Sequence, residues 1–182
     1  MFNEKILYQN YFSNKISEET LAEQLKLSDK DFPLVVQDKM KQDLDEKDAE
    51  MLEYHLYSVF MWEARISPEK REPLDIFADT LNRLLLCVWH KQHEDIVTLL
   101  QKISAESSVD VLYKAIYLKL PYLEWDDNFS FQKKCVRAIN HIGGERACRY
   151  LELLCQEKNP IIRELAERKR KENYHAEYKI ST

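Results

Sequence analysis

The chain has 182 residues, of which 45% are hydrophobic and 32% are charged, with a formal net charge of −5. This length can bury one continuous core, so we expect a single domain over residues 1–182 that needs neither a metal nor disulfides for stability. The acidity lies mainly in residues 1–66, which hold 8 Lys and Arg against 14 Asp and Glu. An acidic surface repels phosphate backbones, which disfavours direct nucleic-acid binding and favours a basic protein partner.

The sequence shows neither a secretory signal nor a membrane span. The first residues lack a basic segment followed by an apolar one, and the longest strongly apolar run covers only 84–89. The cysteines lie in apolar periodic stretches without zinc-ligand spacing, so we interpret them as reduced core residues of a cytoplasmic protein. These cysteines are Cys87, Cys135, Cys148 and Cys155.

Apolar residues recur at helical spacing along the whole chain, and its only two glycines are adjacent. The expected fold class is therefore all-α, with about ten helices. Ser17 and Asp31 are expected to cap two successive helices, and Asp45 to open a third, "EKDAEMLEYHLYSVFMWEA". The segment "SPEKREP" (67–73) is expected to be a linker, because it has two prolines and no large apolar residue.

After the linker, apolar residues again predict successive helices. One apolar stripe extends from Leu74 to Val88, and a second begins at Ile96. A further helix, "VDVLYKAIYLKL", is expected to end at Pro121, because proline cannot continue a helix.

The stretch "WHKQHEDIVTLL" (89–100) holds two histidines and two acidic residues, which raises the question of a metal site. His90, His93 and Glu94 have neither the order nor the spacing of a zinc-protease helix. We therefore interpret this stretch as a helix junction. His90 would end one helix, where partial positive charge is favourable, and Glu94 and Asp95 would begin the next.

Two later segments align with each other at an offset of 31 residues. They are "FQKKCVRAINHIG", which begins at Phe131, and "IRELAERKRKE", which begins at Ile162; Cys135 is aligned with Ala166. The helices predicted before them also correspond, at an offset of 38 residues. Repeats of two helices at this spacing predict a solenoid.

These segments resemble HEAT repeats, which have an apolar-Arg-x-x-Ala core helix and a turn after "IG". Ile162-Arg163 with Ala166 carries the resemblance, as does Ile142-Gly143, whereas Phe131-Gln132 departs from it by lacking the arginine. The resemblance implies a right-handed α-solenoid of HEAT-like helical hairpins.

The solenoid is expected to cover residues 74–173, with residues 1–66 as a helical N-terminal cap. HEAT repeats mostly provide surfaces for partners, so the resemblance predicts a protein-binding module and not an enzyme. No catalytic residue, metal or cofactor is expected. HEAT-repeat hydroxylases bind iron through several His-Glu pairs, and His93-Glu94 is the only such pair in this sequence.

The whole chain also resembles bacterial HEAT-containing immunity-type proteins, through residues 89–96 and 122–126. This resemblance implies a protein that binds and neutralises a toxin domain of a polymorphic or contact-dependent inhibition system. A nuclease toxin suits an acidic surface, because its groove must be basic. The alternatives are a HEAT-repeat adaptor for another cytosolic protein, or a HEAT-based hydrolase or metal enzyme.

The segment "PYLEWDDN" (121–128) is the main candidate for the binding site, because it combines aromatic anchors with carboxylates. The expected partner-binding residues here are Tyr122, Glu124, Trp125, Asp126 and Asp127. In the alternative interpretation Trp125 belongs to the core, and Asp126 or Asp127 caps the following helix.

A second acidic stretch, 37–53, has seven acidic and three basic residues. It is either a solvated helix face or an acidic patch that meets a basic partner. The partner-binding residues expected in this stretch are Asp43, Asp45, Glu46 and Glu50.

Overall fold

The structure, a computed structural model, describes residues 3–65 and 74–180, with side chains described up to residue 172. Within these ranges the chain forms ten α-helices, three short 3-10 helices and no strand, which confirms the predicted all-α fold class. None of these helices combines the length and apolarity needed to cross a membrane. The expected linker at 67–73 lies outside the described residues.

The chain divides into two compact units, Met1–Thr80 and Leu81–Thr182. The boundary between them falls within helix α5 (Ala78–Leu85). The single domain expected from the length, with a cap over residues 1–66 and repeats over residues 74–173, stays a prediction.

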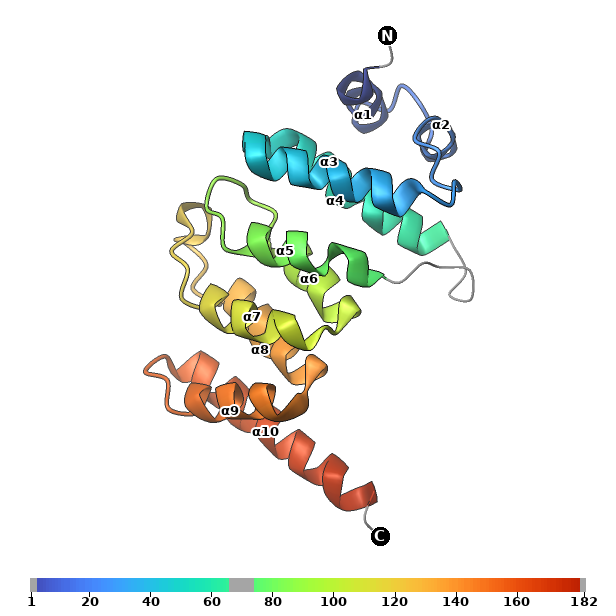
Figure 1. Ribbon diagram of the computed structural model, residues 1–182. Helices are drawn as coiled ribbons and strands as arrows, with labels where there is room; N and C mark the ends of the chain where they lie inside the picture. The colour runs from blue at the N-terminus through green and yellow to red at the C-terminus, as the bar shows by residue number, and fades with distance from the viewer. Residues whose placement is uncertain (1–2, 66–73, 181–182) are drawn as a thin grey trace. The chain divides into compact units, whose positions relative to one another are not determined.

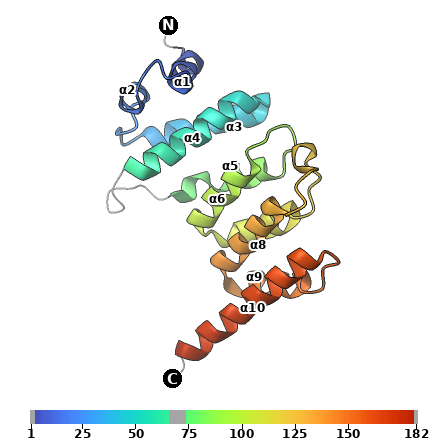
Figure 2. The ribbon, with the colours of Figure 1, turned by 180° about the vertical axis from the view of Figure 1, so that it is seen from behind.

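The first unit consists of four α-helices followed by a 3-10 helix. These are α1 (Glu4–Phe12), α2 (Glu18–Gln24), α3 (Phe32–Glu46), α4 (Ala49–Arg65) and η2 (Leu74–Phe77). Helices α3 and α4 pack along each other as a hairpin, and α1 packs against α2 (Figures 1 and 2). The largest side chains of this unit buried to below 2% exposure are Trp62, Tyr8, Phe77, Leu21, Met40, Leu52 and Leu56.

Two of the predicted helix starts are found at the expected residues. The side chain of Ser17 accepts a hydrogen bond from the backbone N–H of Thr20 at 3.2 Å and so caps α2. Asp31 precedes α3, with Pro33 in the first turn, but no hydrogen bond from its side chain caps the described helix. The start of α3 therefore depends on the fixed φ of proline more than on a side-chain cap.

The helix start predicted at Asp45 is wrong. Asp45 lies within α3, which ends where Lys47 adopts a left-handed φ of 57°. Asp48 then caps α4, because its carboxylate accepts the backbone N–H groups of Glu50 at 3.2 Å and Met51 at 3.0 Å. Three acidic residues stand close together here, and only the backbone turn selects which one serves as the cap.

The second unit contains most of the remaining helices. They are α6 (His93–Ile103), η3 (Glu106–Ser108), α7 (Val109–Ala115), η4 (Pro121–Leu123), α8 (Ser130–Ile142), α9 (Gly144–Leu154) and α10 (Pro160–Ile180). Helix α8 lies at the centre of the unit and packs against α6, α7, α9 and α10 (Figures 1 and 2). Its buried face includes Phe131, Cys135 and Ile139, each 0% exposed.

The residues aligned between the two predicted repeats occupy buried positions. Phe131 and Cys135 on α8 are 0% exposed, and their counterparts Ile162 and Ala166 on α10 are 3% and 0% exposed. Helix α7 packs against α8, and α9 packs against α10. The alignment therefore pairs core positions of two consecutive helix pairs.

Two helices are shorter than the apolar pattern predicts. Helix α5 ends at Leu85, and Val88 is 60% exposed, so the stripe expected to continue to Val88 is wrong. Helix α7 ends at Ala115 and not at Pro121. In both places the backbone closes with hydrogen bonds to the third residue back, such as Cys87 N–H to Leu84 O at 2.9 Å, which tightens and terminates the helix.

The four cysteines are free, and they differ in burial. Cys135 is a core residue, as predicted, and Cys87 and Cys155 are half-buried. Cys148 is exposed, so its predicted place in the core is wrong. Its helix α9 buries Ala147 and Leu151, and Cys148 falls on another face of the helix.

Candidate functional site

Two buried histidines form the junction between α5 and α6. His90 and His93 are 2% and 0% exposed, and their rings stack with centroids 4.4 Å apart. His93 is the first residue of α6, with Glu94 and Asp95 beside it in the first turn. The helix junction predicted for this stretch is therefore confirmed.

Hydrogen bonds determine the protonation of both rings. A backbone carbonyl can only accept, so Nε2 of His90 donates to Leu84 O at 2.9 Å, and Nε2 of His93 donates to Cys87 O at 2.7 Å. The backbone N–H of Gln92 donates to Nδ1 of His90 at 3.1 Å, so that nitrogen carries no proton. Burial lowers the pKa of His90; burial and repulsion from His90 together lower the pKa of His93 to about 4. Both rings are neutral at pH 7.

This neutrality corrects the charge expected for His90. The residue does not end a helix as a partial cation, because α5 ends earlier, at Leu85, and the buried ring is uncharged. It instead donates to the carbonyl of Leu84, one of the groups that the end of a helix leaves without an intrahelical partner. Among the described side chains, no group of three or more His, Cys, Asp or Glu could hold a metal ion.

Tyr122 connects the junction to loop 121–129. Its hydroxyl lies 2.9 Å from Nδ1 of His93 and donates to it, because the neutral ring carries its proton on Nε2. Burial raises the pKa of Tyr122 to about 12, so the phenol keeps the proton that it donates. The first turn of the loop is thereby attached to the first residue of α6.

Asp126 fixes the other end of the loop. One carboxylate oxygen accepts the N–H of Asn128 at 3.1 Å, and the other accepts the N–H of Ser130 at 2.6 Å. Phe129 adopts a left-handed φ of 52° and Ser130 begins α8. Asp126 thus accepts the first N–H of α8, in keeping with the alternative role predicted for it, but the N-cap position itself is Phe129, which has no side-chain cap.

Between these two attachments, Trp125 projects into solvent. Its side chain is 90% exposed, the largest value among the large apolar side chains described, so the alternative that it belongs to the core is wrong. Glu124 and Asp127, on either side of Trp125 in the sequence, are also exposed. An aromatic side chain with carboxylates around it is the composition of a protein-binding epitope.

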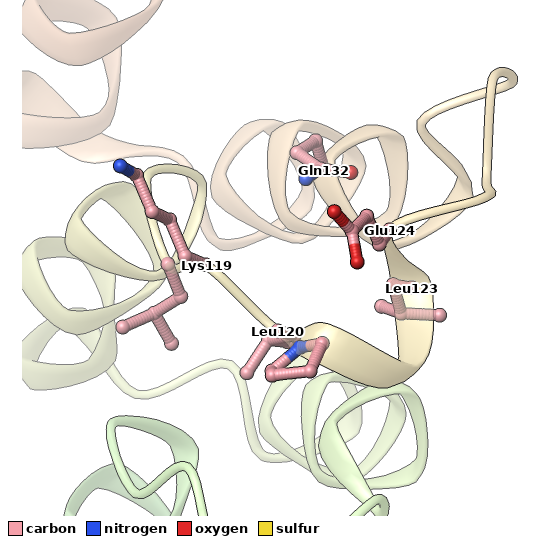
Figure 3. A pocket seen from close by; sticks show the side chains of 7 residues that line it. Lys119, Leu120, Leu123, Glu124 and Gln132 are labelled. Carbon is pink, nitrogen blue, oxygen red and sulfur yellow. The ribbon is translucent and has the colours of Figure 1, made fainter.

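A pocket of about 340 Å³ adjoins this loop (Figure 3). Apolar side chains from the end of the α7 segment and from η4 make up much of its lining, and three polar side chains complete it. The apolar residues include Leu120, Pro121 and Leu123, and the polar ones are Lys119, Glu124 and Gln132.

Asp43, in the first unit, does not belong to a binding surface, which corrects its predicted role. It is 4% exposed, and its Oδ2 lies 2.5 Å from Nδ1 of His55 on α4. The other ring nitrogen of His55 lies 3.6 Å from a carboxylate oxygen of Glu4. Lys39 donates to both oxygens of Glu4 at 2.8 Å. These four residues form a charged network between α1, α3 and α4.

The pKa values in this network follow from burial opposed by pairing. Burial disfavours the charged form of His55, but the hydrogen bond to Asp43 and the negative charges of Asp43 and Glu4 raise its pKa above the ordinary value. Burial raises the pKa of Asp43 even though His55 stabilises its charge. For Glu4, burial is outweighed by the nearby positive charge of His55 and by hydrogen bonds from Lys39, and the pKa is lowered.

The other acidic residues predicted in this unit differ in availability. Asp45 and Glu46 are exposed on the last turn of α3. Glu50 is half-buried and engaged within the unit, by an ion pair with Lys5 at 2.7 Å and a hydrogen bond from Gln9 at 3.1 Å. Asp45 and Glu46 therefore remain candidates for partner contact, whereas Glu50 would have to exchange its present contacts.

Sequence reasoning missed both the His55 network and the pocket. Asp43 and His55 are on different helices, and no local spacing indicates that their side chains meet. Lys119 and Gln132 come from separate segments that converge only at the pocket. No motif signal exists for either arrangement, because each depends on contacts between elements.

Comparisons of this chain with protein-family models, with curated proteins and with solved structures found no match. What can be said of this protein therefore comes from its own fold and site. In its described part it is all-helical, and its second unit presents a fixed loop with an exposed tryptophan between two exposed carboxylates.

Proposed function

We propose that this chain is a non-enzymatic protein-binding module and that loop 121–129 is its binding site. The observation that carries the proposal is the 90% exposure of Trp125 on a loop attached at both ends. Leaving an indole in water forgoes about 25 cal/mol per Å² of apolar surface, which a partner can recover. Tryptophan is also enriched among residues that dominate binding energy, and a fixed loop loses little entropy on binding.

The charge around Trp125 favours a basic partner. Glu124 and Asp127 are exposed, and residues 121–129 contain no Lys or Arg. Asp45 and Glu46 add exposed acidic charge in the first unit. The resemblance to bacterial immunity proteins favours a cognate toxin domain as this partner, and the acidic loop favours a nuclease, whose groove must be basic.

The same proposal includes the finer fold. The consecutive pairs α7–α8 and α9–α10, with their equivalent buried positions, support HEAT-like hairpins of a right-handed solenoid. An experimental structure tests this part, because HEAT-like hairpins must stack in the same order and hand. A bundle with another order of packing would contradict it.

The test of function begins with the partner. The products of genes adjacent to the one that encodes this chain would be expressed separately and assayed for growth inhibition, with and without this protein. We expect one toxic neighbour that this chain binds and neutralises. A bound neighbour that is not toxic would favour the alternative of an adaptor. Stoichiometric iron or zinc in the purified protein would favour the alternative of a metal enzyme.

With a partner in hand, Trp125→Ala is the decisive variant. We expect it to weaken binding by more than about 2 kcal/mol, because a central tryptophan is removed from the interface. Val88→Ala is the matched control, since Val88 is also an exposed apolar residue of the second unit but lies outside the loop. Equal affinities of Trp125→Ala and wild type, by calorimetry, would overturn the proposed site.

A further inference from the structure

The pocket beside Trp125 combines an apolar lining with charged groups that have no partner among the described residues. Leu120 and Leu123 both line the pocket. Leu120 is 7% exposed and Leu123 is half-buried, so each is held in the fold while part of its side chain faces the pocket. Within the described chain, neither the carboxylate of Glu124 nor the ammonium of Lys119 has a hydrogen-bond or ion-pair partner. The pocket therefore offers hydrocarbon contact and an unsatisfied carboxylate together.

The directions of the polar side chains indicate which charge a ligand of this pocket would carry. Figure 3 shows the carboxylate of Glu124 and the amide of Gln132 together on one side of the pocket, whereas the ammonium of Lys119 is turned away from them. The chain from Pro121 to Phe129 carries three acidic residues and no basic one. Glu124 therefore gives this side of the pocket a negative charge, which favours a cationic ligand over an anionic one.

An arginine side chain matches both properties. Its aliphatic stem can lie on leucine and proline, and its planar guanidinium can donate two parallel hydrogen bonds to a carboxylate. Its remaining N–H groups can reach a second acceptor, for which the amide oxygen of Gln132 is available beside Glu124. A lysine ammonium is more strongly hydrated and lacks this fork, so it fits the pair less well.

We propose that this pocket receives one arginine side chain of the partner protein, with its stem on Leu120 and Leu123 and its guanidinium on Glu124. The inference rests on the proposed function and deepens it, because it names the residue that a basic partner inserts beside Trp125. The partner would then be held by two neighbouring anchors, the indole projecting outward and the arginine projecting inward.

The test needs no knowledge of the partner. The full-length ¹⁵N-labelled protein is titrated with N-acetylarginine N-methylamide, and backbone N–H shifts are followed by NMR. The citrulline analogue is the matched probe, because it keeps the shape of arginine and lacks the charge. We expect saturable shifts at residues 118–124 and 132, with arginine binding about tenfold more tightly than citrulline, as one charge-assisted pair provides.

Two variants locate the charge. Glu124→Gln should reduce arginine affinity about tenfold, whereas Asp127→Asn should change it less than about twofold, because Asp127 is an exposed acid of the same loop that does not line the pocket. Unchanged shifts outside the loop verify that each variant is folded. Equal affinities for arginine and citrulline, equal effects of the two variants, or no shift at residues 118–124 would overturn the inference.

These outcomes are independent of those for the proposed function. Loss of partner binding in Trp125→Ala with no arginine binding would keep the binding loop and reject the arginine pocket. Arginine binding with full partner affinity in Trp125→Ala would keep the pocket and reject Trp125 as the anchor.

Discussion

The two compact units bury histidine side chains in contrasting surroundings. In the first unit, His55 lies between the carboxylates of Asp43 and Glu4, and its pKa is raised. In the second, His90 and His93 stack on each other and donate to backbone carbonyls, and their pKa values are lowered. All three histidines are at most 3% exposed, so burial alone does not decide their charge.

The difference lies in what the ring nitrogens meet. A carboxylate beside the ring stabilises the doubly protonated, charged form. Where one ring nitrogen donates to a carbonyl and the other accepts from a donor, a second ring proton would break the accepted hydrogen bond, so the neutral form is favoured. The first unit thus uses acidic residues such as Asp43 inside the fold. The second unit holds its histidines neutral and leaves Glu124 and Asp127 at the surface. Part of the acidity of the first unit therefore serves packing, although Asp45 and Glu46 stay exposed, whereas Glu124 and Asp127 of the second unit are exposed on the candidate loop.

The largest effect is expected where the charged network is broken. His55→Ala should lower the free energy of unfolding of the first unit by about 3 kcal/mol, because it leaves buried Asp43 without its partner. Urea unfolding followed through the NMR signals of α4 measures this. Adding Asp43→Asn to that variant should recover part of the loss, since the stranded charge is removed. If the second change recovers nothing, the loss comes from packing and not from charge.

The two units should respond to pH in opposite directions. The raised pKa of His55 gives stability that is complete below its unfolded pKa of 6.5 and is lost as pH rises through the folded pKa. The raised pKa of Asp43 likewise lowers the unfolding free energy as pH rises, but at lower pH than His55. The lowered pKa of Glu4 has the opposite effect, because its contribution to stability is lost as pH falls below 4.5. The unfolding free energy of the first unit should therefore decline between neutral and alkaline pH.

In the second unit, the lowered pKa of His93 gives stability that is complete above pH 6.5 and is lost as pH falls toward about 4. We expect a decline of about 2 kcal/mol, less than the full shift implies because local opening lets the ring take up a proton. Unfolding measured from pH 8 to 4 should show this slope, and His93→Gln should lack it. A variant with the wild-type slope would mean that other groups cause it.

Removing the hydroxyl that links the loop to the neutral histidines should have a smaller effect. Tyr122→Phe leaves Nδ1 of His93 without its donor, so we expect a loss of about 1 kcal/mol in the unfolding free energy of the second unit. Tyr117→Phe is the control, because it removes an exposed hydroxyl whose hydrogen bond, to Glu157 at 2.5 Å, lies outside this junction. Equal losses in the two variants would show that the link to His93 contributes no more than an exposed hydrogen bond.

The smallest effects should separate the two neighbouring aspartates. Asp126→Ala removes the acceptor for the N–H groups of Asn128 and Ser130 at the start of α8 and should lower the unfolding free energy by about 1 kcal/mol. Asp127→Ala should change it by less than about 0.5 kcal/mol, because this side chain is exposed. Thermal unfolding of both variants checks this. Equal effects would remove the distinction between a structural and a surface carboxylate.

The helical class and most of the core were predictable because they depend on local periodicity. The spacing of Leu52, Leu56 and Val59 predicts one buried helix face, and all three side chains are at most 1% exposed. Ser17 was likewise recognisable as a cap, since capping depends on neighbours within one turn. Predictions failed at ends of helices, as at Asp45 and Val88, where closure of the backbone and not composition sets the boundary.

The sequence by itself determined that this chain is helical, that its acidity is concentrated in residues 1–66, and that residues 121–128 combine aromatic and acidic side chains. Only the tertiary structure decided the use of each acidic residue. Asp43 is buried against His55, Asp126 closes a turn, and Glu124 faces a pocket. The physical reason is that the sequence shows only an acidic residue at each of these positions. Its role depends on which donors other elements bring within hydrogen-bond distance.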